Sequence, residues 1–171
     1  PIHVLETNLH ETEVLLEVAA PHRVPLLMAS TSEVYGKSQK AAFSEEDDLL
    51  IGPPHQSRWS YACSKLMDEF LAMAYAQEKN LPVVIVRYFN VYGPRLDRMD
   101  RGRVITMFMG QLLRGEPLTV IGDGTQTRCF TYVDDAIRAT VQAGLRPEAV
   151  GDVINIGSDQ EVAIRDLAAS M

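Results

Sequence analysis

The chain is poor in cysteine and has no long hydrophobic run. Only two cysteines occur among its 171 residues, Cys63 and Cys129, and neither has a partner at CxxC or metal-ligand spacing. This disfavours a zinc site and a disulfide framework and fits a reducing compartment. No apolar segment approaches the roughly 20 residues of a membrane-spanning helix, and no charged-then-apolar leader opens the chain. We expect a cytoplasmic protein that binds neither a metal nor a membrane.

Basic charge is scarce as well. The chain has 16 lysines and arginines against 23 aspartates and glutamates, a formal net charge of -7 at pH 7. A nucleic-acid-binding protein normally presents a concentrated basic face, so this balance argues against that class. With 46% hydrophobic and 23% charged residues and no repeats, the length fits one globular domain with a sizeable core.

Helix-period and strand-like segments alternate along the chain, which is typical of an α/β fold with a largely parallel sheet. Asp134 is placed to cap the helix predicted over residues 134–144. The predicted order is helix 2–20, strand 26–29, helix 59–80, strand 83–86, helix 103–114, strand 118–121, helix 134–144, strand 153–156 and a helix from residue 164.

A tyrosine and a lysine, Tyr61 and Lys65, are spaced Y-x-x-x-K on the second predicted helix, after a strand that leads into Thr31. Residues four apart share one helix face, so the lysine ammonium can lie beside the phenol and favour its phenolate. A free phenol has a pKa of ~10, several units above that of a base poised for neutral pH. The pair predicts a general base that takes a proton from an alcohol, with Thr31 as a neighbouring hydroxyl.

A glycine-rich phosphate loop is missing. A dinucleotide-binding α/β domain normally opens with a strand, a glycine-rich turn and a helix whose N-terminus holds the pyrophosphate. The nearest glycines, Gly122 and Gly124, lead into Arg128 and a strand-like stretch instead of a helix. We therefore expect a fragment that contains the chemistry and the sugar-facing half without the cofactor cradle.

Four motifs occur in one order along the chain: Thr31 to Gly36 (TSEVYG), the Tyr61/Lys65 pair, Tyr88 to Arg95 (YFNVYGPR) and the turn from Gly122 to Arg128. Together they resemble the extended short-chain dehydrogenase/reductase family of NAD-dependent nucleotide-sugar epimerases, dehydratases and decarboxylases. The resemblance implies a partial Rossmann-like, doubly wound parallel sheet with part of a smaller C-terminal substrate-binding subdomain. It also implies NAD as cofactor and a UDP-sugar as substrate.

The resemblance implies a division of the chain as well. Residues 1–93 would be the C-terminal half of the dinucleotide-binding domain, to which 134–157 return. Residues 94–133 and 158–171 would be part of the nucleotide-sugar subdomain.

The resemblance assigns roles to individual residues. Thr31 and Tyr61 would contact the sugar 4-hydroxyl, Tyr61 taking its proton while hydride leaves C4 for the nicotinamide, and Lys65 would hold the ribose. Further cofactor contacts are assigned to Asn8, Ser30 and Phe89. Further substrate contacts are assigned to Asn90, Arg103, Val104, Thr119, Ile121 and Arg128.

Each of these roles has a purely structural alternative. Asn8 would then be a solvent-facing helix residue, Phe89 a core aromatic, and Arg128 the partner of a surface salt bridge.

The reaction that follows C4 oxidation is less sharply predicted. Dehydratases of this kind tend to carry Asp-Glu after the threonine, whereas this chain has Ser32-Glu33. The Thr-Ser-Glu order is similar to that of UDP-glucuronate decarboxylases, with Glu33 as a further catalytic residue. A UDP-glucose 4-epimerase is the alternative. A non-catalytic fragment that binds a nucleotide sugar is the alternative from another class.

The second long helix has apolar residues on two faces. Leu66, Phe70, Met73 and Ala74 suit a core, which leaves a stripe of Met67, Leu71 and Tyr75. A symmetric partner could cover that stripe, so we expect a homodimer through helices 2–20 and 59–80.

Overall fold

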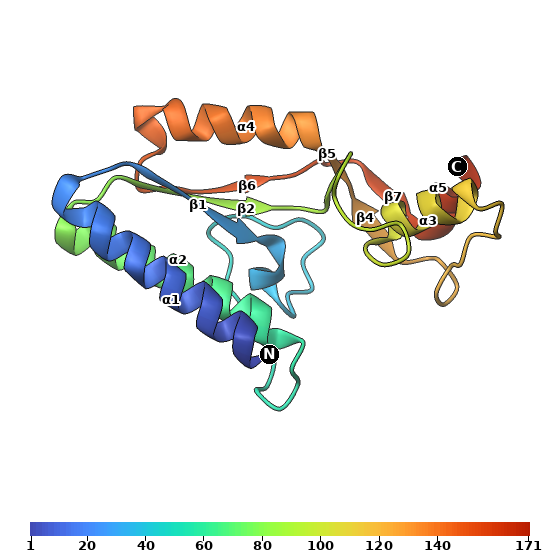
Figure 1. Ribbon diagram of the computed structural model, residues 1–171, viewed down its shortest axis with the longest axis horizontal. Coiled ribbons are helices and arrows are strands. Elements are labelled where there is room, and N and C mark those ends of the chain that lie inside the picture. The colour runs from blue at the N-terminus through green and yellow to red at the C-terminus, as the bar shows by residue number, and fades with distance from the viewer. The chain divides into compact units, whose positions relative to one another are not determined.

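The structure is a computed structural model that describes residues 1–171. Its contacts divide the chain into two units, which we describe separately (Figure 1). The first unit comprises Pro1–Tyr88 and Arg138–Ile156, and the second comprises Phe89–Ile137 and Gly157–Met171. The chain crosses between the units three times, and one of these crossings falls inside a helix, α4 (Val133–Leu145).

A parallel three-stranded sheet forms the centre of the first unit. Its strands are β1 (Leu26–Thr31), β2 (Val83–Tyr88) and β6 (Val153–Ile156), in the spatial order β1-β2-β6. The first five residues of β2 are all buried, as expected of a central strand that is covered on both faces. Thr31 pairs in register with Tyr88, so β1 and β2 end together at one edge of the sheet.

Helices cover both faces of this sheet. Figure 1 shows α1 (Ile2–Ala19) and α2 (Trp59–Lys79) side by side on one face and the first unit's part of α4 on the other. α2 ends where Asn80 adopts a left-handed backbone conformation with φ of 53°, a common helix terminator. The core between the helix pair and the sheet consists of Leu16, Ala19, Ala72, Leu81, Val83 and Ile85. The predicted doubly wound α/β arrangement is therefore confirmed for this part of the chain.

The remaining regular elements of the first unit are short. They are the 3-10 turns η1 (Ala20–His22), η2 (Ser32–Tyr35) and η3 (Pro147–Ala149).

None of the helices in the structure combines the length and the apolar character that a membrane-spanning segment needs.

The buried side of α2 differs from the predicted one. Phe70, expected in the core, is 64% exposed, whereas Leu71 and Tyr75 pack against the core cluster. The reason is that α2 also turns charged residues inward: Asp68 and Glu69 are both buried. Apolar periodicity alone cannot locate a face whose position is set partly by polar partners on the sheet.

Glu69 is held by a buried ion pair. Arg87 of β2 donates to both carboxylate oxygens, from Nε to Oε1 at 3.0 Å and from Nη2 to Oε2 at 2.7 Å. Ser30 of β1 also donates to Oε1. The Arg87 guanidinium further donates to the hydroxyl of Tyr35 at 2.9 Å, and that hydroxyl donates to Asn155 of β6 at 2.8 Å. The network joins α2, η2 and all three strands.

The second unit is built from short elements around two small sheets. β3 pairs with β5 in parallel, and β4 pairs with β7 in antiparallel. Its elements are β3 (Val91–Tyr92), α3 (Val104–Leu113), β4 (Thr127–Cys129), β5 (Thr131–Tyr132), the first turns of α4, β7 (Glu161–Ala163) and α5 (Ile164–Ser170).

Two predictions for this unit are wrong. Residues 118–121 form no strand because no neighbouring strand pairs with them. Instead the Gln111 side chain accepts from the Thr119 N–H at 3.1 Å, and Gln126 donates to the Ile121 carbonyl at 3.0 Å. Asp134 does not cap α4: it lies inside the first turn, where its charge still suits the positive end of the helix.

The buried ion pair yields a stability prediction. Arg87→Met should lower the free energy of unfolding of the complete protein by about 3 to 5 kcal/mol, because it leaves the Glu69 carboxylate buried without a counter-charge. Adding Glu69→Met should recover part of that loss. Urea unfolding followed by circular dichroism measures both effects. The control is Arg98→Met, which breaks a solvent-exposed pair with Asp100 and should cost less than about 1 kcal/mol. Equal losses in Arg87→Met and Arg98→Met would contradict the prediction.

Candidate active site

The carboxyl end of β1 presents the predicted hydroxyl. Thr31 is the last residue of the strand and is half-buried. Its Oγ1 accepts from the backbone N–H of Glu33 at 3.3 Å, a local turn that opens η2. Glu33 itself is exposed. Thr31 and Glu33 therefore lie two residues apart at the edge where two parallel strands end.

The predicted base lies on the first turns of α2, which packs against η2. Tyr61 is 40% exposed, so a ligand can reach its phenol. Lys65 follows one helical turn later, as the spacing predicts. Its Nζ donates to Oδ2 of Asp68 at 3.0 Å, and its side chain is 16% exposed.

Asn8 connects α1 to this turn of α2. Its Nδ2 donates to Oγ of Ser64 at 2.9 Å, and that hydroxyl donates to the Tyr61 carbonyl at 2.9 Å. Asn8 is thus not the solvent-facing residue of the structural alternative. It holds the backbone between Tyr61 and Lys65.

Ser30 faces inward. It is 5% exposed, and its hydroxyl is engaged by the carboxylate of Glu69. Burial acts to lower the pKa of the Arg87 guanidinium, but the hydrogen bonds to Glu69 and Tyr35 outweigh it and raise that pKa above its usual value. The Arg87 guanidinium therefore stays charged despite its burial.

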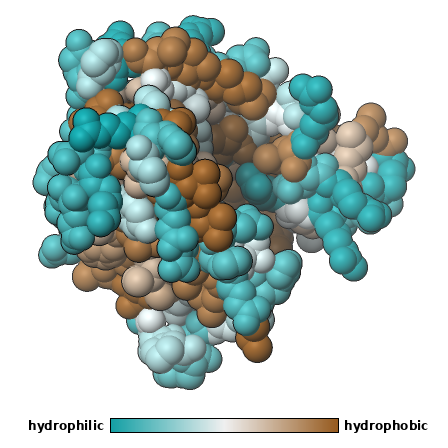
Figure 2. Space-filling model, turned by 60° about the vertical axis from the view of Figure 1, so that its left-hand side comes forward, coloured by the Kyte–Doolittle hydropathy of each residue, from teal (hydrophilic) through white to brown (hydrophobic).

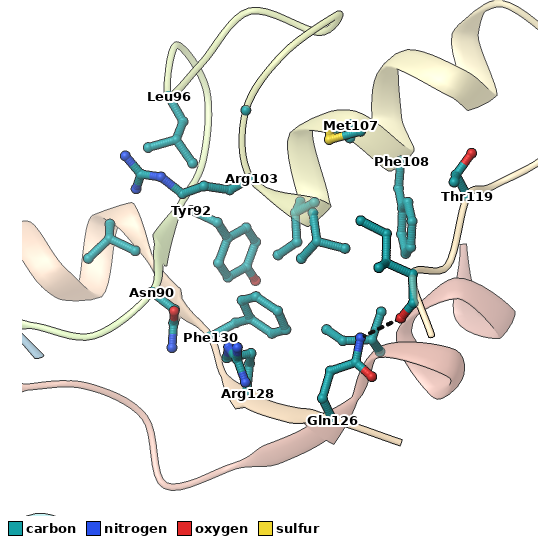
Figure 3. A pocket seen from close by; sticks show the side chains of 16 residues that line it. Asn90, Tyr92, Leu96, Arg103, Met107, Phe108, Thr119, Gln126, Arg128 and Phe130 are labelled. Carbon is teal, nitrogen blue, oxygen red and sulfur yellow. Dashed lines mark hydrogen bonds between the residues drawn. The ribbon is translucent and has the colours of Figure 1, made fainter. Parts of the chain in front are cut away.

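The second unit contains a pocket of about 360 Å³. All six of the substrate-contact residues predicted outside the first unit line it: Asn90, Arg103, Val104, Thr119, Ile121 and Arg128. They come from four separate stretches of sequence, so only the folded chain brings them together. The sixteen lining residues are mainly apolar (Figure 3).

Aromatic rings occupy the middle of this pocket. Tyr92 and Phe130 meet edge to face with ring centroids 6.3 Å apart. In Figure 3, Arg103 extends past Tyr92 toward Leu96, and Arg128 lies beside Phe130 on the other side of the pair. Arg103 Nε lies 3.5 Å from Oδ2 of Asp97, and Arg128 Nη1 donates to the Thr127 carbonyl at 2.6 Å without any acidic partner. An apolar pocket with two guanidinium groups suits a ligand that has a planar ring and anionic groups.

Local hydrogen bonds shape the rest of the pocket wall. Asn90 has a left-handed backbone with φ of 40° and donates from Nδ2 to the Cys129 carbonyl at 3.1 Å. The side chain of Gln111 donates to the hydroxyl of Thr119 at 2.8 Å. Burial, followed by the nearby charge of Glu161, raises the pKa of the Cys129 thiol. That cysteine is therefore a neutral structural group here.

Phe89 is the one residue of the second unit with a predicted site role that does not line this pocket. A Cβ atom added at Gly157 would meet the Phe89 Cβ at 3.0 Å, so Phe89 packs closely against that glycine. Its carbonyl accepts from the Thr131 hydroxyl at 3.0 Å.

Several residues of both sites escaped the sequence analysis. The pocket also includes Tyr92, Phe130, Phe108 and Gln126, and the Lys65 ammonium is paired with Asp68. Two of these carried a usable signal. Tyr92 lies inside the 88–95 motif, and Asp68 stands three residues after Lys65, at ion-pair spacing on a helix.

The fold and the first site define a class of protein. A parallel sheet with helices on both faces binds its ligands at the carboxyl ends of the strands. Here that edge carries Thr31, and the adjoining helix carries Tyr61 and Lys65 at one-turn spacing. This is the arrangement of a short-chain dehydrogenase/reductase.

Comparison with known proteins identifies the family. Residues 1–157 match the NAD dependent epimerase/dehydratase family, so the chain belongs to it. It is 47% identical over 167 residues to a UDP-N-acetyl-alpha-D-glucosaminuronate decarboxylase from Bacillus cytotoxicus, covering 98% of this chain and 51% of that protein.

Solved structures of the same kind superpose closely on the chain. The PbgP3 protein from Burkholderia pseudomallei matches 99% of this chain and 53% of its own, with a TM-score of 0.89 and 34% identity. A UDP-glucuronic acid 4-epimerase from Bacillus cereus, solved with UDP-glucuronic acid and NAD, matches 94% of this chain and 48% of its own, with a TM-score of 0.77 and 41% identity.

The chain therefore spans about half the length of the relatives it matches. The family resemblance, the partial Rossmann-like fold and NAD as the family's cofactor are confirmed. Residues 1–171 include Tyr61 and Lys65, to which the resemblance assigns cofactor contacts, but they include no glycine-rich phosphate loop.

Proposed function

We propose that the protein carrying this chain is an NAD-dependent nucleotide-sugar enzyme that oxidises the C4 hydroxyl of a UDP-sugar, and that its substrate is a UDP-hexuronate that it decarboxylates. The observation that carries the proposal is the intact set of Thr31, Tyr61 and Lys65 where β1 and α2 meet η2. The relatives support it, because one is named as a UDP-sugar decarboxylase and another was solved with a UDP-sugar acid.

The chain's own residues account for the proton chemistry of the first step. Tyr61 accepts the proton of the C4 hydroxyl, and Thr31 holds that hydroxyl by a hydrogen bond. The positive charge of Lys65 one turn away favours the phenolate form of Tyr61. When bound, NAD supplies the oxidation by accepting a hydride from C4 and later returning it.

The 4-ketone makes decarboxylation possible. The C5–C6 bond breaks, carbon dioxide leaves, and the electron pair of that bond is accepted by the adjacent ketone as an enolate. Glu33, exposed at the start of η2 two residues after Thr31, is the acid/base residue assigned to proton transfer at C5. The product after hydride return is a UDP-pentose.

The pocket of the second unit is the proposed nucleotide-sugar subsite. Arg128, which has no acidic partner, would pair with a diphosphate oxygen, and Asn90 would contact the same group. Arg103, Val104, Thr119 and Ile121 would surround the base and ribose. Asn8, Ser30 and Phe89 keep their proposed places near the cofactor, and the hydroxyl of Ser30 would reach it only by leaving Glu69.

Residue ranges follow from these roles. The proposal assigns 1–93 and 134–157 to the dinucleotide-binding domain, and 94–133 and 158–171 to the nucleotide-sugar subdomain.

Epimerisation at C4 is the second candidate. The observation that favours it is the 41% identity to a UDP-glucuronic acid 4-epimerase. An epimerase uses the same Thr31, Tyr61 and Lys65 but presents the other face of the ketone for hydride return, and it leaves Glu33 without a proton to move. A UDP-glucose 4-epimerase is the neutral-sugar version of this alternative. A non-catalytic nucleotide-sugar-binding protein is the alternative outside enzymes.

We also propose a cytoplasmic homodimer. α1 and α2 carry large apolar side chains on their outer surface, and Figure 2 shows brown hydrophobic residues at the surface among hydrophilic ones. Those on the two helices include Val14, Leu15, Val18, Met67 and Phe70. A symmetric partner would cover this stripe, which differs from the predicted one because Phe70 replaces Leu71 and Tyr75.

Product analysis tests the reaction. Proton NMR of UDP-glucuronate, of its 2-acetamido counterpart and of UDP-glucose, each incubated with NAD and the complete protein, separates the candidates. Pentose signals from either uronate support decarboxylation. Inversion at C4 without loss of C6 would contradict decarboxylation and support epimerisation. No turnover with preserved UDP binding would leave a binding protein.

Tyr61→Phe should abolish turnover, with a loss of at least about 100-fold in kcat, because the general base is removed while the ring is kept. The affinity for UDP, measured by calorimetry, should stay within about twofold. Tyr75→Phe on the same helix is the matched control and should keep its activity. Near-normal turnover by Tyr61→Phe would remove that residue from the mechanism.

Arg128→Ala should weaken UDP-sugar binding by about 1.5 to 3 kcal/mol, the scale of a charge-assisted hydrogen bond. Arg114→Ala, at the end of α3 with its own exposed partner Glu116, is the control and should change binding little. The measurement is a calorimetric titration with UDP. An unchanged dissociation constant for Arg128→Ala would make it a structural surface residue.

The dimer proposal predicts that Phe70→Glu converts the complete protein from dimer to monomer in size-exclusion chromatography with light scattering, because charge would be buried in an apolar interface. Leu113→Glu, equally exposed at the end of α3, should leave the dimer intact. A Phe70→Glu dimer of undiminished stability would place the interface elsewhere.

A further inference from the structure

Asp68 is a buried acid to which none of the roles above is assigned. It is 0% exposed, and its one ion pair is the 3.0 Å contact between Oδ2 and the Nζ of Lys65. Its other oxygen, Oδ1, is buried without any hydrogen-bond partner. The neighbouring carboxylate, Glu69, differs in this respect because both of its oxygens are bonded.

An acid in this state does not serve stability well. Burying a carboxylate costs several kcal/mol unless its charge is paired and its oxygens are satisfied, and Asp68 is only half satisfied. An apolar residue of similar size would cost less at this position. The arrangement is therefore explained by what the carboxylate does to its partner, Lys65.

The surroundings hold Asp68 in place. It lies one helical turn after Ser64, which is also fully buried and is bonded to Asn8 of α1. Residues four apart share a face of a helix, so this face of α2 is covered where Asp68 emerges. Lys65, by contrast, has a flexible four-carbon stem and three N–H donors.

We propose that Asp68 is the positioning residue of Lys65: its immobile carboxylate fixes one N–H of the ammonium and so directs the other two toward the cofactor ribose and toward the Tyr61 side. The proposal rests on the proposed function of Lys65. Asp68 itself touches neither substrate nor cofactor, because its carboxylate is entirely buried.

A double-mutant cycle in the complete protein tests this. Asp68→Asn should weaken NAD binding about tenfold and lower kcat, with the affinity for UDP unchanged. In a Lys65→Met background the same change should have no further effect on NAD affinity, because there is no ammonium left to position. The asparagine oxygen could still accept a hydrogen bond from the ammonium and keep NAD binding normal. Asp68→Ala removes the acceptor altogether and should then show the loss of NAD affinity.

Stability measurements separate positioning from packing. Lys65→Met alone should destabilise the protein because it leaves Asp68 buried and unpaired, and adding Asp68→Asn should restore stability. The proposal is overturned if both Asp68 variants bind NAD normally, or if Asp68→Asn weakens NAD binding equally in the presence and absence of Lys65.

A failure of the proposed function would look different. Wild-type protein that neither binds NAD nor converts a UDP-sugar would refute that function, and the contact would remain testable by competitive acetylation with acetic anhydride and mass spectrometry. Lys65 should then react several-fold faster in Asp68→Asn than in wild type, while the exposed Lys79 of the same helix reacts equally in both. An unchanged Lys65 rate would overturn the positioning role on its own.

Discussion

The buried ion pair between Glu69 and Arg87 is the contact on which the rest of the first unit depends. It joins α2 to the central strand, and through Ser30 and Tyr35 it reaches β1 and η2. Ser30 directly precedes Thr31 in the chain, and Glu69 lies two turns after Tyr61. The relative placement of the hydroxyl and the phenol is therefore set by a charged network beneath them. A purely apolar core would permit sliding, whereas bidentate hydrogen bonds tolerate little displacement.

Two adjacent acids on α2 have different partners: Glu69 pairs with Arg87 of the sheet, and Asp68 pairs with Lys65. Consecutive residues on a helix point about 100° apart, so Glu69 faces the strand and Asp68 faces the lysine. One turn of helix thus sets both the helix-to-sheet register and the environment of the ammonium. This also explains why the apolar stripe of α2 is not where hydrophobicity alone places it, since charged residues take up part of the inward face.

The pocket of the second unit follows a different principle. Its walls come from turns and short segments that are held by side-chain to backbone hydrogen bonds, such as those of Gln111 with Thr119 and Gln126 with Ile121. Gly122 and Gly124 adopt φ values of 75° and 71° and allow the tight turn between these segments. Loops on a rigid scaffold can change their ligand without changing the fold. This agrees with relatives that are named for different reactions, a UDP-sugar decarboxylase and a UDP-sugar 4-epimerase.

The sequence by itself determined what depends on local spacing. The α/β alternation, the one-turn separation of Tyr61 and Lys65, the Thr31-Ser32-Glu33 order and the family were all readable from neighbours along the chain. The roles of individual residues stay predictions, because the comparisons reach the family and not the site.

Only the tertiary structure decided what depends on distant partners. Residues 118–121 look like a strand but have no strand beside them, and Phe70 looks like core but faces outward because Glu69 takes the inward direction. The pocket gathers Asn90, Arg103 and Arg128 from separate stretches of the sequence. In each case the outcome depends on whether groups far apart in sequence come into contact, which no local pattern encodes.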